Sequence, residues 1–158
     1  MSENSFIEIT SPTQKAEICE KILRALPNWF GVEESIIEYI RDVQTMPFFA
    51  AFAQDMPIGF AALKEHNNCT AEVCVMGVLT EYHRQGLGRL LLQRCEQYCR
   101  ESGRAYLTVK TLDAARPSRS YEKTRNFYLA LGFQPLEVFP LYWDADNPCL
   151  FLVKHLCV

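Results

Sequence analysis

The sequence predicts a single α+β domain over residues 1–158, in which four helices flank a mixed, mostly antiparallel sheet of about seven strands. The length of 158 residues is that of one domain, and 49% hydrophobic residues suit a chain with a substantial core. Helix and strand periodicities alternate along the whole chain, without an internal repeat or a flexible linker. Three extended stretches precede a strand–helix–strand pattern, so both antiparallel and parallel pairing are expected.

The individual elements follow from where the apolar periodicity changes and where turn residues interrupt it. In chain order we expect a strand at residues 6–10, a helix from Ser11 to Pro27, a helix at 32–43, strands at 48–54, 58–65 and 70–79, a helix from Gly86 to Gly103, a strand at 105–110, a helix from Ser118 or Ser120 to Gly132, and strands at 133–142 and 150–155.

Helix ends carry the clearest local signals. Ser11 is a capping residue, Pro12 suits the first helical position, and Gln14 completes a capping box. Gly103 and Gly132 stand where a helix ends in the left-handed conformation. These signals predict the starts and stops of helices before any tertiary contact is considered.

The charge and the cysteines exclude several classes of function. A net charge of −3 gives no electrostatic footprint for nucleic acid or an anionic membrane, and no apolar run is long enough to span a bilayer. The N-terminal residues lack the features of a secretory signal. Seven cysteines without a CxxC pair argue against a disulfide framework and a metal site, and favour reduced thiols in the cytoplasm.

Residues 75–92 carry the most informative pattern, a strand that runs through a tight turn with Gly86 and Gly88 into a helix. The first amides of a helix lack partners, and the helix dipole adds partial positive charge there. Glycine permits close approach of a diphosphate, and Arg84 and Arg89 flank the turn. The spacing fits neither a P-loop nor a dinucleotide fingerprint. The pattern therefore predicts an anion site, with a plain tight turn as the alternative.

Residues 78–91, VLTEYHRQGLGRLL, resemble the coenzyme A motif of the GNAT superfamily of N-acyltransferases. Residues 126–133, NFYLALGF, resemble the second motif of that family, and the element order matches its architecture over nearly the whole chain. The resemblance implies acetyl-CoA as the acetyl donor and no metal. It implies a primary amine of a small molecule or peptide as the acceptor, and a homodimer is one of the oligomeric states left open.

The resemblance also implies the residues that bind acetyl-CoA. His83 stands where the family usually has Gln or Arg, and Tyr121 stands where many relatives carry an Asn that contacts the pantetheine arm. That contact is then expected from Tyr121 itself, from Arg125 or from Asn126. The implied partners of the pantetheine arm are Met76, Gly77 and Val78, and those of the pyrophosphate are the amides of Arg84, Gln85, Gly86, Leu87, Gly88 and Arg89.

Two residues are candidates for catalysis. Family resemblance assigns Tyr128 the role of the acid that protonates the leaving thiolate; the alternative is an aromatic ring packed in the core. Glu72 is the candidate general base, because strand alternation places it on one otherwise apolar face with Cys74, Met76 and Val78. A carboxylate on an apolar face is costly, and action as a base through water would account for it. A solvated carboxylate, with water as the base, is the alternative for Glu72.

In the fold that the resemblance implies, the acceptor lies between the loop joining the first two helices, here residues 28–31, and the loop before the last strand, here residues 139–148. Trp29, Phe30 and Trp143 are the candidate substrate-binding residues, and Asp144 and Asp146 lie beside them in the sequence. Aromatic rings with carboxylates suit a cationic amine. Tryptophans that merely fix two loops to the core are the alternative.

Besides a structural domain without a ligand, two further interpretations of the whole chain remain open. One is a non-catalytic module that binds acyl-CoA on the same fold. The other is a binder of a different phosphate ligand, in which the glycine turn only imitates the motif.

Overall fold

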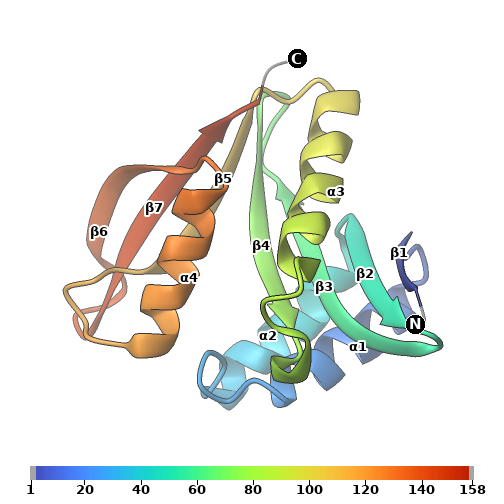
Figure 1. Cartoon of the computed structure of the whole chain (residues 1–158). Coiled ribbons are helices and arrows are strands. Elements are labelled where there is room, and N and C mark those ends of the chain that lie inside the picture. Colours follow the sequence, from blue (N-terminus) through green and yellow to red (C-terminus); the bar gives the residue numbers. More distant parts are fainter. Residues whose placement is uncertain (1–2, 157–158) are drawn as a thin grey trace.

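Seven strands form one sheet with helices on both faces in the computed structural model, which describes residues 3–156 (Figure 1). The strands are β1 (Asn4–Glu8), β2 (Phe48–Ala53), β3 (Met56–Glu65), β4 (Thr70–Val78), β5 (Tyr106–Leu112), β6 (Gln134–Asp144) and β7 (Asn147–His155). The helices are α1 (Pro12–Arg24), α2 (Glu33–Asp42), α3 (Leu87–Glu101) and α4 (Arg119–Ala130), with single 3-10 turns at Val43–Thr45 and Thr80–Tyr82. Within residues 3–156, no helix is both long and apolar enough to cross a membrane.

The sheet has the strand order β1-β2-β3-β4-β5-β7-β6. All neighbours pair antiparallel except β4 and β5, which are parallel and joined through α3. The predicted meander of three strands and the predicted strand–helix–strand crossover are both confirmed. The parallel ladder between β4 and β5 pairs only residues 70–72 with residues 106–108.

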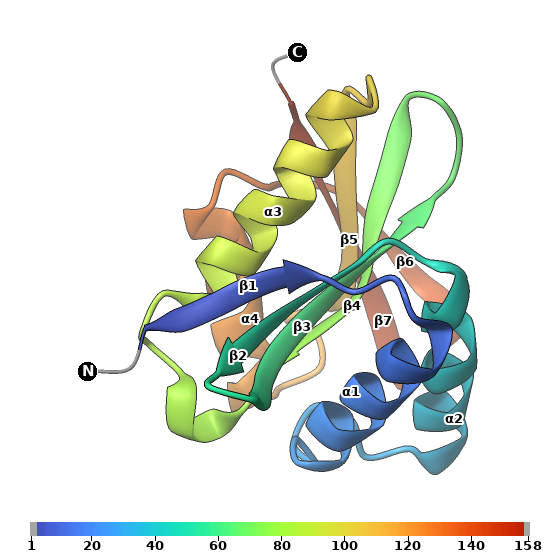
Figure 2. The ribbon, with the colours of Figure 1, turned by 90° about the vertical axis from the view of Figure 1, so that its right-hand side faces the viewer.

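Helices α3 and α4 cover one face of the sheet, and α1 and α2 cover the other (Figure 2). Two glycines in the sheet mark the two faces. A Cβ atom on Gly77 would lie 2.8 Å from Leu26, just beyond α1, whereas one on Gly59 would lie 3.4 Å from Leu91 of α3. The absence of side chains at these positions lets the helices pack closely on both sides of the central strands.

Two predicted helix starts are confirmed by capping hydrogen bonds and two predicted stops by backbone angles, whereas α1 ends at Arg24 rather than at Pro27. Ser11 Oγ accepts the amide of Gln14 at 3.3 Å, and Ser118 Oγ accepts the amide of Tyr121 at 3.3 Å. The start of the last helix, which the sequence left open between two serines, is therefore capped by Ser118. Gly103 and Gly132 have φ angles of 77° and 94°, as helix-terminating glycines do.

A β-bulge changes the faces of β4. The register with β3 shifts between Ala62 and Leu63, and β4 accommodates the shift with one extra residue at Cys74. The prediction that four side chains of β4 lie on one face is therefore wrong, because strict alternation ends at the bulge. The four residues concerned are Glu72, Cys74, Met76 and Val78.

The neighbours of these side chains show the change of face. Burial raises the pKa of Tyr39 on α2 far above its usual range, and the nearby Cys74 and Glu72 add to this effect. Glu72, which precedes the bulge, and Cys74, at the bulge, therefore both lie on the α2 side of the sheet. Met76 lies beyond the bulge on the opposite face, where its terminal methyl is 3.9 Å from the position of a Cβ on Gly88 of α3.

Two predicted boundaries differ at the edges of the sheet. Strand β1 spans Asn4–Glu8 rather than residues 6–10, because it pairs with residues 49–53 of β2. The expected loop at residues 139–148 is mostly strand, since β6 continues to Asp144 and β7 begins at Asn147. The Asp144 carboxylate accepts hydrogen bonds from the amide of Asp146 and from Asn147 Nδ2, so the chain reverses within two residues.

Candidate active site

The turn before α3 presents a row of free backbone amides. The six amides of residues 84–89 donate no hydrogen bond to any group in residues 3–156. Arg84 and Gly86 have φ angles of 61° and 80°, which curl the chain into a concave loop, and Gly86 provides no side-chain cap for the helix. A concave row of amides at the positive end of a helix dipole is a binding site for a phosphate or diphosphate.

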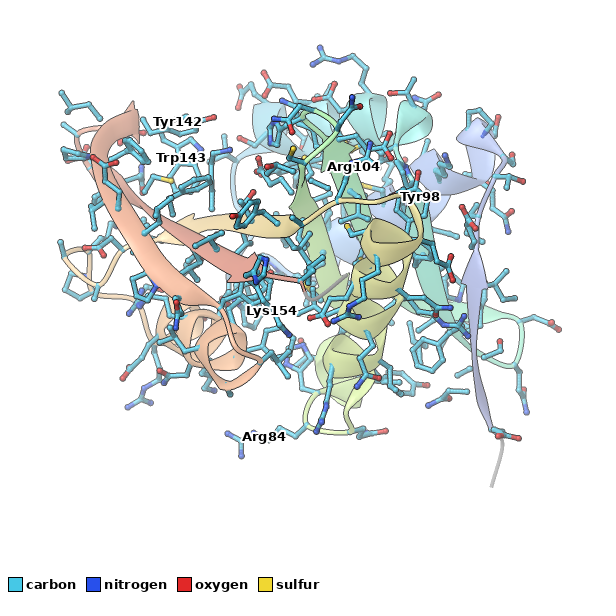
Figure 3. The ribbon with its side chains drawn as sticks, turned by 90° about the horizontal axis from the view of Figure 1, so that it is seen from above. Arg84, Tyr98, Arg104, Tyr142, Trp143 and Lys154 are labelled. Atoms are coloured by element: carbon cyan, nitrogen blue, oxygen red, sulfur yellow. The ribbon has the colours of Figure 1, made fainter. Side chains whose placement is uncertain are left out.

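Glycine at position 88 brings this turn close to α4. A Cβ on Gly88 would lie 3.0 Å from the ring of Phe127, nearer than real Cβ atoms ordinarily approach. The two sequence motifs thus contact each other directly. The exposed side chain of Arg84 projects away from the ribbon on the α3 side, where it can add positive charge (Figure 3).

Strands β4 and β5 separate soon after they begin to pair. Their ladder comprises only residues 70–72 with residues 106–108, although β4 continues to Val78 and β5 to Leu112. The two strands lie together at the top of Figure 1 and diverge toward the bottom. Met76, Gly77 and Val78 therefore have no partner on β5, and the edge of β4 is available to another extended chain.

Two polar groups near this open edge indicate what could bind there, one by its hydrogen bond and one by the lack of one within residues 3–156. The Nε2 of His83 donates a 2.6 Å hydrogen bond to the carbonyl oxygen of Val78, since a carbonyl can only accept. Thr111 Oγ1 on β5 is buried and has no hydrogen-bond partner within the described residues. An orphaned buried hydroxyl beyond the end of the β4–β5 ladder fits a polar ligand between the strands.

Tyr128 is 4% exposed on α4 and packs against Phe127 and Phe133 with ring centroids 5.2 and 5.4 Å away. Burial raises the pKa of Tyr128 far above its usual range, and the nearby Cys95 and Tyr121 add to the effect. Its hydroxyl makes no hydrogen bond to another group of residues 3–156. The phenol therefore stays protonated at neutral pH and can act as a proton or hydrogen-bond donor, but not as a base.

Glu72 is buried, with 9% of its side chain exposed, and it is ion-paired. Its Oε1 accepts hydrogen bonds from Lys110 Nζ at 2.6 Å and from His66 Nε2 at 2.7 Å. Burial lowers the pKa of Lys110, but the hydrogen bond and the charge of Glu72 outweigh that effect and the net shift is upward. Glu72 is thus a buried carboxylate with a cation in contact, not a solvated one.

The segment between α1 and α2 is held onto α4 by a set of hydrogen bonds. The Trp29 indole N–H donates to Thr124 Oγ1 at 3.1 Å and to the carbonyl oxygen of Ser120 at 3.3 Å. The Tyr121 hydroxyl donates to the carbonyl oxygen of Trp29 at 2.7 Å. The Trp29 ring also meets His83 edge-on, with centroids 5.7 Å apart. Trp29 therefore connects the loop, α4 and the turn before α3.

The other predicted binding residues lie apart from this cluster. Phe30 is half-buried against Tyr39, whereas Asn126 is exposed and makes no hydrogen bond within the described residues. Trp143 is 45% exposed beside Tyr142, and both lie on the side of the sheet that carries α1 and α2 (Figure 3). The structure thus brings Trp29 and Tyr121 together and leaves Asn126 outside.

Sequence reasoning missed Lys110, His66 and Thr111. A lysine in the apolar strand 106–112 was the available signal for Lys110, because a buried cation needs an anionic partner. No local signal identifies His66 or Thr111, since their significance depends on neighbours from other strands. Within residues 3–156, no group of three or more His, Cys, Asp and Glu side chains could hold a metal ion.

Comparisons with known proteins agree with this geometry. The model of the acetyltransferase (GNAT) domain matches residues 44–135. An uncharacterised N-acetyltransferase, CT2212, from Chlorobaculum tepidum is 31% identical over 118 residues, which cover 72% of this chain and 66% of that protein, just under two thirds of its length.

Solved structures share the fold across nearly the whole chain. A GNAT-family protein from Desulfovibrio desulfuricans superposes with a TM-score of 0.84 and 19% identity, covering 98% of this chain and 100% of that one. A GNAT-family acetyltransferase from Elizabethkingia anophelis with acetyl-CoA bound gives a TM-score of 0.75 and 16% identity, covering 99% and 100%.

Proposed function

Because the chain belongs to the GNAT family of acetyltransferases, we propose that it transfers the acetyl group of acetyl-CoA directly to a primary amine of a small molecule or peptide. The observation that carries this proposal is the row of six free amides at residues 84–89, next to a β4 edge without a partner. A diphosphate and an extended amide-bearing arm are the two parts of coenzyme A that such a pair of features would bind.

The residues of this chain fit acetyl-CoA as a co-substrate. The amides of residues 84–89 would hold the pyrophosphate, with Arg84 and Arg89 adding charge. The free edge at Met76–Val78 would pair with the pantetheine arm. The unpartnered hydroxyl of Thr111 supports a polar ligand between the strands, because a buried donor without a partner is costly.

The reaction moves one acetyl group and two protons. The amine nitrogen attacks the thioester carbonyl carbon, an N–C bond forms, and the C–S bond breaks to leave a thiolate. Tyr128 would donate its proton, or a hydrogen bond, to that sulfur, since its raised pKa keeps the phenol protonated. Glu72, directly or through water, would accept the proton that the amine loses, and transfer of that proton through solvent to the Tyr128 phenolate would restore both groups. The products are an amide and the free thiol of coenzyme A.

A free-thiol assay with acetyl-CoA and a panel of amines tests the proposal, with the wild type compared with Tyr128→Phe. We expect turnover with at least one amine and a loss of kcat in the variant of about 100-fold or more, with acetyl-CoA binding retained. Acetyl-CoA binding without turnover of any amine would instead support a non-catalytic acyl-CoA-binding module. Failure to bind acetyl-CoA would refute the proposed function.

A cytoplasmic location belongs to the same proposal. All six cysteines in residues 3–156 are free, including the exposed Cys69, and the seventh, Cys157, lies outside the described residues. Free thiols in this number suit a reducing compartment. The homodimer that the sequence left open stays a prediction.

A further inference from the structure

The acceptor side of the sheet carries a buried ion pair that the transfer reaction does not by itself require. Lys110 Nζ lies 2.6 Å from Glu72 Oε1, and it lies 5.3 Å from the ring centroids of both Tyr142 and Phe151. The Lys110 side chain is 17% exposed, so it is not fully enclosed by the protein. Lys110 is thus a partly accessible cation, flanked by aromatic rings and paired with the candidate base.

The carboxylate of Asp144, one of the two acidic groups expected beside the acceptor, is hydrogen-bonded within the hairpin turn. Both oxygens of Asp144 accept hydrogen bonds from Asn147 Nδ2, at 2.9 and 3.0 Å, and its Oδ1 also accepts the amide of Asp146. The main-chain oxygen of Asp146 binds Arg116. The hairpin turn therefore uses Asp144 internally, and the carboxylate facing Lys110 is that of Glu72.

The charge balance at this place discriminates between classes of amine. Lys110 and Glu72 together carry no net charge, and His66 forms a second hydrogen bond with Glu72. A simple amine or a polyamine enters as a cation and brings uncompensated positive charge beside Lys110. A zwitterion brings one charge of each sign, so each member of the existing pair gains a partner and no net charge is buried.

We propose that the acceptor is an α-amino acid, whose carboxylate binds Lys110 and whose amine is presented to Glu72. The inference rests on the proposed acetyl transfer and names its substrate class. Because Lys110 and Glu72 are adjacent, they match an ammonium and a carboxylate carried on one carbon. When the substrate carboxylate takes Lys110, Glu72 Oε1 is released from that ion pair and can accept a hydrogen bond from the amine.

Matched acceptors test this proposal in the free-thiol assay. Each L-amino acid is compared with its own amide and with the decarboxylated amine, which keep the amine and the side chain but lack the carboxylate. We expect kcat/KM for the best amino acid to exceed that of its amide by about 100-fold, in line with a charge-assisted pair. Equal or better turnover of the amide or the amine overturns the proposal, although acetyl transfer itself would stand.

Variants of Lys110 test whether this residue causes the preference for an amino acid over its amide. Lys110→Met should raise KM for the amino acid by about 30-fold and change that for the amide less than about 3-fold, while Lys110→Arg keeps part of the preference. Lys21→Met, on the exposed side of α1, is the matched control and should change neither. An unchanged amino acid preference in Lys110→Met overturns the proposal. If the single variant folds poorly, Glu72→Gln/Lys110→Met keeps the site neutral, and binding of the amino acid rather than turnover is measured, since Glu72 is the candidate base.

Calorimetric binding separates this inference from the proposed function. Amino acid and amide are titrated into the wild type and Lys110→Met with coenzyme A present. Binding of the amino acid to the wild type but not to Lys110→Met supports the carboxylate site even if no acceptor is turned over, which would refute acetyl transfer alone. Equal binding of the amide, or no binding of either molecule, overturns the carboxylate site.

Discussion

The hydroxyl of Tyr121 on α4 donates a 2.7 Å hydrogen bond to the main-chain oxygen of Trp29, in the segment between α1 and α2. Tyr121 stands where many family members carry an asparagine for the cofactor arm. In this chain its hydroxyl is hydrogen-bonded to the segment between α1 and α2, which borders the proposed acceptor side of the sheet. The segment is held from both directions, because the Trp29 indole donates back to Thr124 and Ser120 of α4.

Removing this hydrogen bond should loosen the Trp29 segment without disturbing the diphosphate turn. We expect Tyr121→Phe to raise KM for the acceptor by about 3- to 10-fold, since one neutral hydrogen bond contributes about 1 kcal/mol. The Kd of acetyl-CoA should change less than about 2-fold. Tyr106→Phe, an exposed tyrosine on β5, is the control for the loss of a hydroxyl. A larger effect on acetyl-CoA than on the acceptor would instead give Tyr121 the role of the missing asparagine.

Gly86 and Gly103 form a matched pair for testing the anion site. Both have positive φ angles, 80° and 77°, and both have open space where a Cβ would be placed. Alanine at either position should lower the unfolding free energy by about 1–2 kcal/mol through backbone strain alone. Only Gly86→Ala should also raise the Kd of acetyl-CoA, by about 10-fold or more, because it distorts the row of amides. Equal Kd values for the two variants would contradict the site.

Thr111 and Thr108 make a second matched pair. Thr111 Oγ1 has no partner within residues 3–156, whereas Thr108 Oγ1 donates to the carbonyl oxygen of Ala71 at 3.4 Å. Removing an unsatisfied buried hydroxyl relieves a desolvation cost, so Thr111→Val should raise the unfolding free energy by about 1 kcal/mol. It should weaken acetyl-CoA binding by about 5-fold. Thr108→Val should destabilise the protein and leave binding unchanged, as chemical denaturation and calorimetry would show.

The raised pKa of the buried Tyr128 predicts a loss of folding stability at high pH. Because its pKa is raised in the folded state, the folded protein keeps the proton that the unfolded chain loses near pH ~10. This contribution is fully present below that pH and is lost as the pH rises toward the raised pKa, at about 1.4 kcal/mol per pH unit. The unfolding free energy of Tyr128→Phe should therefore fall less steeply above pH ~10 than that of the wild type. Parallel curves would contradict the burial of an ionisable phenol.

The Glu72–Lys110 pair predicts non-additive effects on stability. Lys110→Met alone leaves a buried carboxylate without its cation, and we expect a loss of about 2–3 kcal/mol. Glu72→Gln/Lys110→Met buries no charge at this position and should recover most of that loss. Denaturant titration of the single and double variants measures the coupling. Additive losses would mean that solvent, rather than Lys110, compensates Glu72.

The sequence by itself predicted the elements, their order and the turn of free amides before α3. Helix starts at Ser11 and Ser118 and stops at Gly103 and Gly132 depend on hydrogen bonds and backbone angles within a few residues, so local residue chemistry was enough. The free amides at residues 84–89 are likewise a property of one turn and one helix end.

Only the tertiary structure decided which side chains meet on the acceptor side. The bulge at Cys74 ended the alternation on which the environment of Glu72 had been predicted, because the register of β4 depends on β3. His66 reaches Glu72 across the nearby turn before β4, whereas Lys110 and Tyr142 reach the site from other strands, at separations that no local pattern encodes. Ion pairs and hydrogen bonds between distant segments form only after the sheet has assembled, so their partners could not be read from periodicity.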